Sequence, residues 1–587
     1  MTNKFLTNLL VISTLFISTA LSFSAQSVES PTKILVSPNI LVTRQDSDLP
    51  HAETIIAVNP KDNKNLLGSA IVFTRDERGN ANKLYASKDG GQTWTQSEFP
   101  ELGNIDPQVA FGINGTAYFH TLGRGRFFYR STDGGISWEK GGQAIVADHP
   151  QLTVDLSSGQ YGGNIYISGM FGIREMRVLR SKDDGKNFDV VKIPNPRGVW
   201  ILNLQPFVMN DGTLFVPYIV WEETNDKQIQ TSRRQIEFVT SNDGGSTFSA
   251  PVKFIDLPSR GMWQMDKLEG NFARQSNYTS FGVDPKTDQI YVVRCTDNEG
   301  KLRAVFSTSK DRGKTWSEPK AIDANIPAWA DQYQAYLAVN KDGVIGVMWY
   351  DTRDCEKQDC YNLYFSASTD GGATFLPAKK ASSETSFPIS SKNLMPFYGF
   401  VIPGKDSSEI RYRSAFGRWA NGGDYLGFIA DAEGAFRPFW IDSRNGVFQV
   451  FTTRIKVGKE EPLPTNLQTI SVRDKIQLMS DPPEYDFAKK EGVIMIRLRN
   501  TSTENIYGAI KLELKKTTGW KVIDANGKES ETTTIDFSKS LGDWKYLPAG
   551  AVSEPVKVRF KFDGKFDGTA NMASFDFDVS GFRQQLR

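Results

Sequence analysis

One eight-residue turn occurs six times in this chain and limits what the chain can fold into. Each copy begins with Ser, centres on Asp-Gly-Gly or a close variant, and ends with Trp or Phe after Thr, Ser or Asn. Asp accepts hydrogen bonds from nearby backbone N–H groups, Gly permits positive φ, and the aromatic ring can pack beneath the turn. The copies are therefore predicted to be structural turns. Their aspartates are Asp89, Asp133, Asp183, Asp243, Asp311 and Asp370.

Strand-like segments surround every copy of the turn. A β-rich run such as "NLYFSA" precedes each one, and two further apolar runs separated by turn residues lie upstream, as in "QAYLAVNKDGVIGVMWY". With the segment after the aromatic residue, each unit has four strands. A four-stranded unit that recurs every 44 to 68 residues without helical periodicity is typical of a β-propeller.

The number of units exceeds the number of boxed turns by one. Seven pairs of apolar runs are visible, and the last unit ends without a turn of this kind. The early segment 34–44 can supply the outer strand of that last unit, which closes the ring without a covalent turn. We therefore predict an all-β chain with a seven-bladed propeller over 34–456, and six blades as the alternative.

Two further segments flank the predicted propeller. Residues 457–466 are charged and contain two prolines, which indicates a linker, and the alternating strands of 467–587 predict a small β-sandwich of immunoglobulin-like or fibronectin-type-III-like kind. At the other end, residues 1–25 have a basic start and a short apolar run, which predicts a cleaved signal peptide and a secreted or periplasmic protein. A membrane anchor is the alternative. The mature chain is expected to have no membrane span.

Charge and cysteine content exclude several classes of protein. The chain has 69 basic and 68 acidic residues, so no overall field attracts nucleic acid. Its three cysteines are too few for a disulfide scaffold. Cys355 and Cys360 could close a small loop as a disulfide, which leaves Cys295 unpaired, or all three could be free thiols.

The boxed turns, together with "HAETIIAVNPKDNKNLLGSA" and "WYDTRD", resemble the BNR or Asp-box repeats of the sialidase superfamily, as found in exported bacterial proteins. The resemblance covers the whole predicted propeller. It implies that the boxed turns lie on the face away from substrate. It also implies that the loops before each innermost strand, and those between the second and third strands, surround the mouth of a central channel.

That geometry selects a set of candidate site residues. Acidic residues before inner strands would form the acid/base pool, with Tyr350 or Tyr425 as a nucleophile; several arginines, with His149, would bind an anionic group of the substrate. The alternative role for each aspartate is to cap a loop or close the channel by hydrogen bonds. The predicted acids are Asp106, Asp148, Asp331 and Asp424, and the predicted anion-binding arginines are Arg124, Arg294, Arg353 and Arg444.

These residues predict an exported, sialidase-like protein that acts on glycans or glycoconjugates. The first hypothesis is a glycoside hydrolase for an acidic sugar that carries a carboxylate or sulfate, because glycosidases need two carboxyl groups beside the scissile bond. The alternative is a non-catalytic propeller that binds a glycan or a protein partner. No cofactor or metal site is predicted, although the channel could hold a structural cation and three scattered histidines could bind a metal.

Overall fold

The computed structural model describes residues 32–584, with gaps at 75–79, 99–104, 123–126, 173, 195–198, 222–233, 258–278, 358, 404–407, 461–462, 482, 519, 525 and 563–573. The expected signal peptide, 1–25, lies outside the described residues. Regular structure is almost entirely β, as predicted for the fold class, with only short helices. Within the described ranges, no helix has the length and apolar character needed to cross a membrane. The short helices are α1 (Ser391–Leu394), α2 (Ala415–Arg418) and 3-10 turns at Arg44–Asp46, Arg473–Lys475 and Ser538–Trp544.

Up to Gly458, the described strands form seven sheets of four or more strands, numbered here in chain order with the ring-closing sheet last, and one hairpin. Sheet 1 contains β3 (His51–Asn59), β4 (Asp62–Val72), β5 (Ala81–Ser87) and β6 (Thr95–Gln96). Sheet 2 contains β7 (Ile105–Phe111), β8 (Ala117–Leu122), β9 (Phe127–Ser131) and β10 (Glu139–Gln143). Sheet 3 contains β11 (Asp148–Val154), β12 (Ile165–Met170), β13 (Met176–Ser181) and β14 (Asp189–Lys192).

The next three sheets repeat this antiparallel order. Sheet 4 contains β15 (Trp200–Asn203), β16 (Phe207–Val208), β17 (Leu214–Trp221), β18 (Arg234–Ser241) and β19 (Val252–Leu257). Sheet 5 contains β20 (Ser280–Val283), β21 (Ile290–Asn298), β22 (Lys301–Ser309) and β23 (Lys320–Ala321). Sheet 6 contains β24 (Gln332–Val339), β25 (Ile345–Asp351), β26 (Asn362–Ser368) and β27 (Lys379–Lys380).

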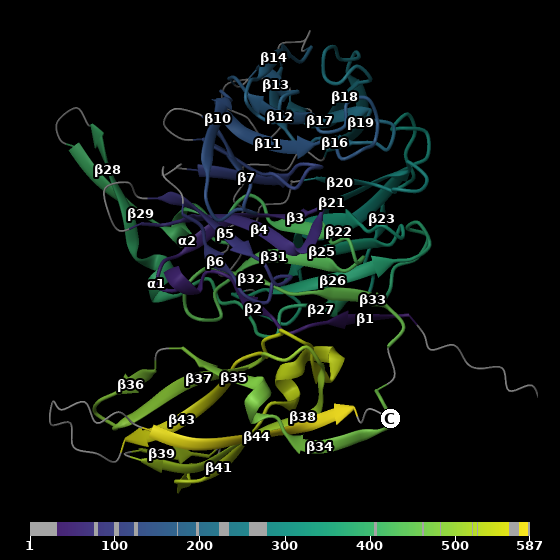
Figure 1. The fold of residues 1–587 in the computed structure, drawn as a ribbon. Helices are drawn as coiled ribbons and strands as arrows, with labels where there is room; N and C mark the ends of the chain where they lie inside the picture. Colours follow the sequence, from purple (N-terminus) through teal and green to yellow (C-terminus); the bar gives the residue numbers. More distant parts are fainter. Residues whose placement is uncertain are drawn as a thin grey trace, which may run out of the picture.

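Sheet 7 combines the two ends of this region. It contains β1 (Lys33–Val36), β2 (Ile40–Leu41), β30 (Gly427–Ala430), β31 (Phe436–Asp442), β32 (Gln449–Thr452) and β33 (Ile455–Gly458). β1 pairs with β33 and β2 with β32, so the ring closure expected from the sequence is present, although two short strands make it where one was expected. The strands β28 (Pro396–Pro403) and β29 (Ser408–Ser414) pair with each other as a separate hairpin (Figure 1).

The sheets are arranged around a central channel as a β-propeller. Inner strand β3 packs against both β7 and β30, β7 packs against β11, and β24 packs against β20 and β30. Between sheets 4 and 5, the rings of Phe207 and Phe281 stack with centroids 5.7 Å apart. All seven sheets contribute residues to one cavity of about 490 Å³, six of them from their innermost strand or the residues just before it, and sheet 4 from the link between β15 and β16. We call the end of this channel where the inner strands begin the mouth.

Each Asp-box turn joins the third and fourth strands of one of sheets 1 to 6 and has the same hydrogen bonds. The Ser hydroxyl donates to the Asp carboxylate at 2.7 to 2.9 Å, and it accepts from the Gly N–H four residues after the Ser. The residue before the aromatic donates to the other carboxylate oxygen, as Thr315 does to Asp311 at 2.6 Å. Hydrogen bonds from Thr315 lower the pKa of Asp311 to about 2.

The C-terminal region forms two sheets that share one apolar core, which is the arrangement of a β-sandwich. The first sheet contains β34 (Leu467–Ser471), β38 (Ile506–Thr518), β41 (Thr533–Asp536), β42 (Tyr546–Leu547) and β44 (Ser574–Gln584). The second contains β35 (Ile476–Ser480), β36 (Glu484–Asp486), β37 (Glu491–Asn500), β39 (Trp520–Ile523), β40 (Glu529–Ser530) and β43 (Val556–Phe562).

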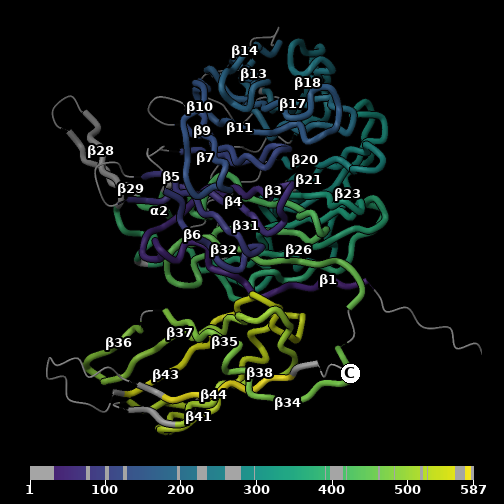
Figure 2. Tube along the Cα trace, viewed as in Figure 1, coloured from purple at the N-terminus to yellow at the C-terminus, as the bar shows by residue number. Residues whose placement is uncertain are grey.

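This sandwich lies beside sheet 7 (Figure 2) and contacts the first Asp-box turn. Arg44 donates to Asp481 at 2.8 Å, and Arg499 of β37 donates to the box residue Asp89 at 3.3 Å. The Asn39 N–H donates to Glu554. Cross-links of this kind hold the ring-closing N-terminal segment between the last sheet and the sandwich. Elsewhere, Cys355 and Cys360 form a disulfide, whereas Cys295 is a buried free thiol.

Candidate functional site

Four inner strands carry the same backbone irregularity at the mouth of the channel. In β3, β7, β11 and β24 a β-bulge interrupts the pairing with the second strand. Each bulge holds one non-glycine residue at positive φ, a conformation that L-residues adopt rarely and that re-aims the side chain. These residues are Glu53 (φ 52°), Asp106 (φ 53°), His149 (φ 47°) and Gln334 (φ 49°).

Two of the predicted acids converge at the His149 bulge. The backbone N–H of His149 donates to Asp106 Oδ2 at 3.3 Å and to Asp148 Oδ1 at 3.1 Å. One carboxylate oxygen from each aspartate and one ring nitrogen of His149 lie within 4.8 Å of one another. Asp106 is only 5% exposed, whereas Asp148 is exposed. The mouth therefore holds a close carboxylate pair with one buried and one solvent-facing member.

More charged groups surround Asp106. Burial raises the pKa of the Asp106 carboxyl, and the nearby carboxylates of Asp148 and Asp424 raise it further, while His149 and a hydrogen bond with Glu53 oppose this shift. Asp424, predicted from the sequence as part of the acid pool, thus belongs to the same cluster. A carboxyl group in such surroundings holds a proton at higher pH than an exposed aspartate does.

The segment Asn421–Tyr425 brings Asp424 to this cluster. The Glu53 N–H donates to Gly422 O at 2.9 Å, and Gln334 Nε2 donates to Gly423 O at 2.6 Å. Gly423 has a φ of 117°, and a Cβ on it would lie 2.5 Å from the Glu53 nitrogen. Only glycine fits between these two bulges, which sets Asp424 beside Glu53.

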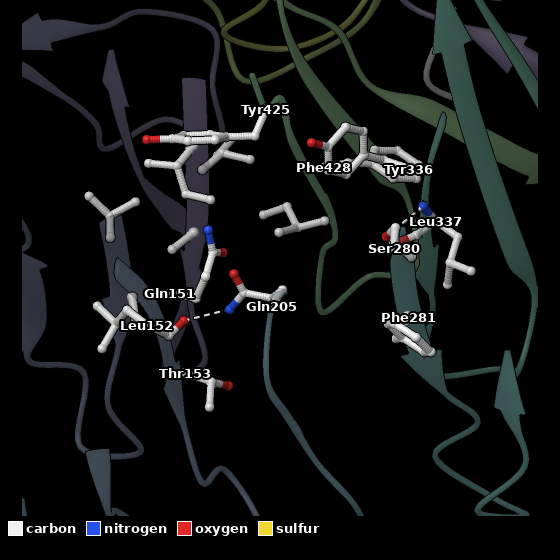
Figure 3. Close-up of a pocket in the computed structure, with 18 of the residues that line it drawn as sticks. Gln151, Leu152, Thr153, Gln205, Ser280, Phe281, Tyr336, Leu337, Tyr425 and Phe428 are labelled. Atoms are coloured by element: carbon white, nitrogen blue, oxygen red, sulfur yellow. Dashed lines mark hydrogen bonds between the residues drawn. The ribbon is translucent and has the colours of Figure 1, made fainter. Parts of the chain in front are cut away.

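Below this cluster, polar and aromatic side chains form the upper wall of the channel cavity (Figure 3). Gln205 Nε2 donates to Leu152 O at 2.7 Å, and Gln151 lies next to it. Tyr336 of β24 and Tyr425, which precedes β30, also line this cavity. Deeper in the channel the lining becomes apolar, with Phe111, Val154 and Val339. The polar chemistry is thus concentrated at the mouth end.

Asp331 does not occupy a position comparable to Asp106, contrary to our expectation. The bulge residue of β24 is Gln334, three positions later, and Asp331 lies before the strand. Its Oδ1 accepts a hydrogen bond from the Leu302 N–H at 2.8 Å, and its N–H donates to Thr352 Oγ1 at 2.8 Å. Asp331 therefore ties sheets 5 and 6 together.

Tyr350, the predicted nucleophile, is fully buried between sheets 6 and 7. Its hydroxyl donates to Ile441 O at 2.8 Å and accepts from the Ile441 N–H at 3.0 Å. Burial, together with the neighbouring Tyr361, raises the pKa of Tyr350 well above its ordinary value. A neutral phenol with both hydrogen-bonding roles filled is a structural cross-link and a poor nucleophile.

Two of the predicted anion-binding arginines are already bound to carboxylates. Arg353 contacts Asp351 at 2.6 Å and Asp323 at 2.7 Å, and its guanidinium lies 4.3 Å from the centre of the Tyr364 ring. Arg444 contacts Asp442 at 2.6 Å and lies 4.3 Å from the ring centre of Phe451. These arginines neutralise buried carboxylates between sheets.

The arrangement around Arg353 and Arg444 is an internal repeat that the sequence analysis missed. In both places a Trp indole N–H donates to the Asp two residues later, Trp349 to Asp351 at 2.8 Å and Trp440 to Asp442 at 3.3 Å. The same Asp then binds the Arg two residues further on. The signal is visible in the sequence as "WYDTR" and "WIDSR".

The other candidates have different surroundings. Arg294 of β21 is 7% exposed, burial lowers its pKa, and within the described residues no carboxylate lies at ion-pair distance from it. Arg124 lies outside the described residues. His51 and His120 are buried, and burial lowers the pKa of each to about 4. His51 bonds Tyr85 and His120 bonds Ala144 O.

One group of residues could hold a metal ion. Asp106, Asp148 and His149 each offer one donor atom, and oxygen and imidazole donors in this combination suit a divalent cation. The three histidines do not form such a group, because His51 and His120 are engaged with Tyr85 and with a backbone carbonyl.

Comparison with known proteins is consistent with the repeat. A family model described as "BNR repeat-like domain" matches residues 195–395, and one described as "BNR/Asp-box repeat" matches residues 129–140. A curated protein named "Sialidase" from Bacteroides fragilis (strain YCH46) is 27% identical over 282 residues, which cover 42% of this chain and 47% of that protein. The chain thus matches about half the length of this relative.

Solved structures with weaker likeness include two fungal enzymes. The alpha-L-arabinofuranosidase Arb93A of Fusarium graminearum is 13% identical with a TM-score of 0.37, covering 72% of this chain and 98% of that one. The alpha-L-arabinanase of Penicillium chrysogenum is 12% identical with a TM-score of 0.36, covering 73% and 98%. By its repeated turns and the family matches, this chain carries BNR/Asp-box repeats and is similar to proteins of the sialidase superfamily.

Proposed function

We propose that this chain is a glycoside hydrolase that cleaves a glycan at an acidic sugar, with Asp106 and Asp148 as its catalytic pair. One observation carries the proposal: the His149 N–H donates to both carboxylates and holds their oxygens within 4.8 Å. Glycosidases act with two carboxyl groups beside the scissile bond. The similarity to the Bacteroides protein named "Sialidase" supports the same class of reaction.

The two aspartates differ in a way that suits different roles. Asp106 is buried beside Asp424 and keeps its proton more readily, so it would donate that proton to the leaving oxygen. Asp148 faces solvent and would attack the anomeric carbon to form a glycosyl ester. Water would then displace the ester as Asp106 takes the proton back. The two carboxylate oxygens lie within 4.8 Å of each other, closer than the roughly 6.5 to 9.5 Å that inverting enzymes need, which favours this retaining course.

We also propose that the seven sheets around the channel are seven blades. Each contributes residues of its inner edge to the cavity wall, and sheet 7 closes through the N-terminal strands β1 and β2. Seven inner strands leave a wider channel than six would, which gives the mouth room for several bulges at once.

The choice of an acidic sugar rests on fewer residues than the sequence suggested. Arg353 and Arg444 are bound to Asp351 and Asp442, which leaves Arg294 as the described candidate for an anion. A buried guanidinium without a carboxylate partner in the described residues is suited to a substrate carboxylate. The name of the Bacteroides relative points the same way.

A non-catalytic propeller that binds a glycan or protein partner is the second candidate. The 5% exposure of Asp106 favours it, because a proton donor must reach its substrate. In that case the bulges would shape a binding mouth and Asp148 would be its exposed polar contact.

Export is a further proposal. It rests on the basic and apolar pattern of residues 1–25 and is supported by the Cys355–Cys360 disulfide, since such bonds persist in oxidising compartments. The linker at 457–466 and the immunoglobulin-like or fibronectin-like type of the sandwich remain predictions.

The hydrolase is tested with the purified mature chain on fluorogenic glycosides of sialic acid, uronic acids and neutral pentoses. Hydrolysis of an acidic glycoside that is lost in Asp106→Asn and Asp148→Asn, but kept in the structural control Asp331→Asn, supports the proposal. If every glycoside stays intact while an acidic glycan binds saturably, the binding propeller replaces the hydrolase.

A further inference from the structure

A second cavity lies between the propeller and the C-terminal sandwich. Its volume is about 760 Å³, which is in the usual range for ligand sites at domain interfaces. The propeller contributes β33 with Lys456, and the turns at Asn340 and Gly434. These turns follow the inner strands, so the cavity is at the opposite end of the propeller from the mouth. The sandwich contributes Trp544 and Tyr546.

Two aromatic rings form the sandwich side of this interdomain cavity. The rings of Trp544 and Tyr546 have centroids 5.8 Å apart and are inclined by 36°. Trp544 ends the 3-10 helix Ser538–Trp544, which packs against β1. Its indole Nε1 is buried, and within the described residues it has no hydrogen-bond acceptor. A buried donor of this kind needs an acceptor from water or from a ligand.

The carboxylates that line the cavity are each paired with a lysine or arginine. Glu460 contacts Lys33 at 2.6 Å and Lys545 at 3.1 Å, and their hydrogen bonds lower its pKa to about 2. The three other carboxylates of the wall are also paired, Asp543 with Lys379, Glu433 with Arg454 and Asp342 with Lys341. The acids that line the cavity are thus neutralised by lysine or arginine.

Lys456 has a different partner. Its Nζ lies 5.1 Å from the centre of the Trp544 ring, and no carboxylate of the described residues is at ion-pair distance from it. An ammonium group beside an indole offers two contacts to one sugar unit. The ring face can pack against the apolar C–H face of the sugar, and the cation can bind its carboxylate.

We propose that this interdomain cavity is a second glycan site that holds a carboxylate-bearing sugar of a polymeric substrate through Trp544, Tyr546 and Lys456. The inference rests on the proposed function for the class of ligand, and it deepens that function by adding a place where the polymer is held. A chain retained there raises the effective concentration of its other units near the mouth.

The test measures binding without cleavage, in the Asp106→Asn background, by titration calorimetry with polygalacturonate and with polysialic acid. Arabinan serves as the neutral polymer. Lys456→Gln and Trp544→Ala should each weaken binding of one of the acidic polymers by about tenfold, which is about 1.4 kcal/mol. Lys314→Gln, which changes an exposed lysine in the fifth Asp-box turn, is the matched control and should bind like the parent.

Each outcome decides the inference. Equal affinity in the parent and in Lys456→Gln overturns it, as does a parent that binds neither acidic polymer. Arabinan bound as tightly as the acidic polymers removes the carboxylate assignment. If Trp544→Ala unfolds, Lys456→Gln alone decides, because it keeps the aliphatic stem over the indole. A negative glycosidase panel leaves these titrations unaffected, so the two proposals fail separately.

Discussion

The hydroxyl of Tyr350 and the backbone of Ile441 form a two-way cross-link between sheets 6 and 7. The hydroxyl donates to Ile441 O at 2.8 Å and accepts from the Ile441 N–H at 3.0 Å. Tyr361 adds a second hydroxyl to the same carbonyl at 3.0 Å. This junction anchors sheet 7, which closes the ring, to sheet 6, so its loss affects closure directly.

Replacing Tyr350 with Phe should therefore lower stability while leaving the specific activity of the folded protein unchanged. The change removes both hydrogen bonds and leaves a buried N–H unsatisfied, which costs about 1 to 3 kcal/mol. Urea unfolding followed by tryptophan fluorescence measures the first effect, and initial rates measure the second. A folded Tyr350→Phe variant that has lost all activity would restore the nucleophile role predicted from the sequence.

Arg353 and Arg294 should respond oppositely to substitution by Met. Arg353→Met leaves the buried carboxylates of Asp351 and Asp323 without their cation, which is expected to destabilise the protein by about 3 to 5 kcal/mol. Arg294→Met removes a charge that has no carboxylate partner in the described residues, so stability should hold while KM for an acidic glycoside rises. The midpoint of thermal unfolding and KM are measured for both. A KM effect confined to Arg353→Met would contradict this assignment.

Asp106→Asn should lower kcat by roughly 10² to 10⁴-fold, because the variant has no proton to give to the leaving group. Its fold should persist, since the amide can still accept from the His149 N–H. EDTA should leave the activity of the parent intact. Activity that EDTA removes and Ca²⁺ restores would instead assign Asp106, Asp148 and His149 to a cation.

Structural features that depend on a few consecutive residues could be predicted from the sequence. Features that depend on how two strands pair, such as the β-bulges, could not. The hydrogen bonds that shape each Asp-box turn, between its Ser, Asp, Gly and Thr positions, come from eight consecutive residues, so the pattern Ser-x-Asp-x-Gly predicts the turn. Closure of the ring by the N-terminal strands could also be predicted, because the seventh unit has no Asp-box turn. The bulges differ: nothing in the sequence places Gln334 rather than Asp331 at the mouth, because a positive φ at a non-glycine residue is imposed by tertiary packing.

The roles of the charged residues were also not predictable from residue type alone. Arg353 and Arg444 were predicted from their residue type to bind substrate, but guanidinium groups bind the nearest buried carboxylate first. Those carboxylates, Asp351 and Asp442, stand two residues earlier in both copies of the Trp-x-Asp-x-Arg pattern. Comparing the two copies within the sequence would have given a structural reason for both arginines before the fold was seen.

The junction of the two domains should weaken as pH rises from about 5 to 8. Glu554 accepts hydrogen bonds from the Asn39 N–H and the Ser383 hydroxyl, beside Arg444 and Glu384. Burial, partly opposed by Arg444, raises the pKa of Glu554 from 4.5 to about 7. The folded protein therefore binds this proton more tightly than the unfolded chain does. The stability linked to it is complete below pH 4.5 and is lost as pH rises through about 7.

Glu554→Gln keeps the shape of the side chain and one of the two acceptor contacts, since its single carbonyl oxygen can accept from Asn39 or from Ser383. It cannot ionise, so its stability should stay flatter between pH 5 and 8. Urea unfolding at several pH values compares it with the parent and with Glu318→Gln, which changes an exposed glutamate far from the junction. A parent whose pH dependence matches that of Glu554→Gln would show that the carboxyl ionises freely at the interface. In that case Arg444, and not the proton, stabilises the contact between the ring-closing segment and the sandwich.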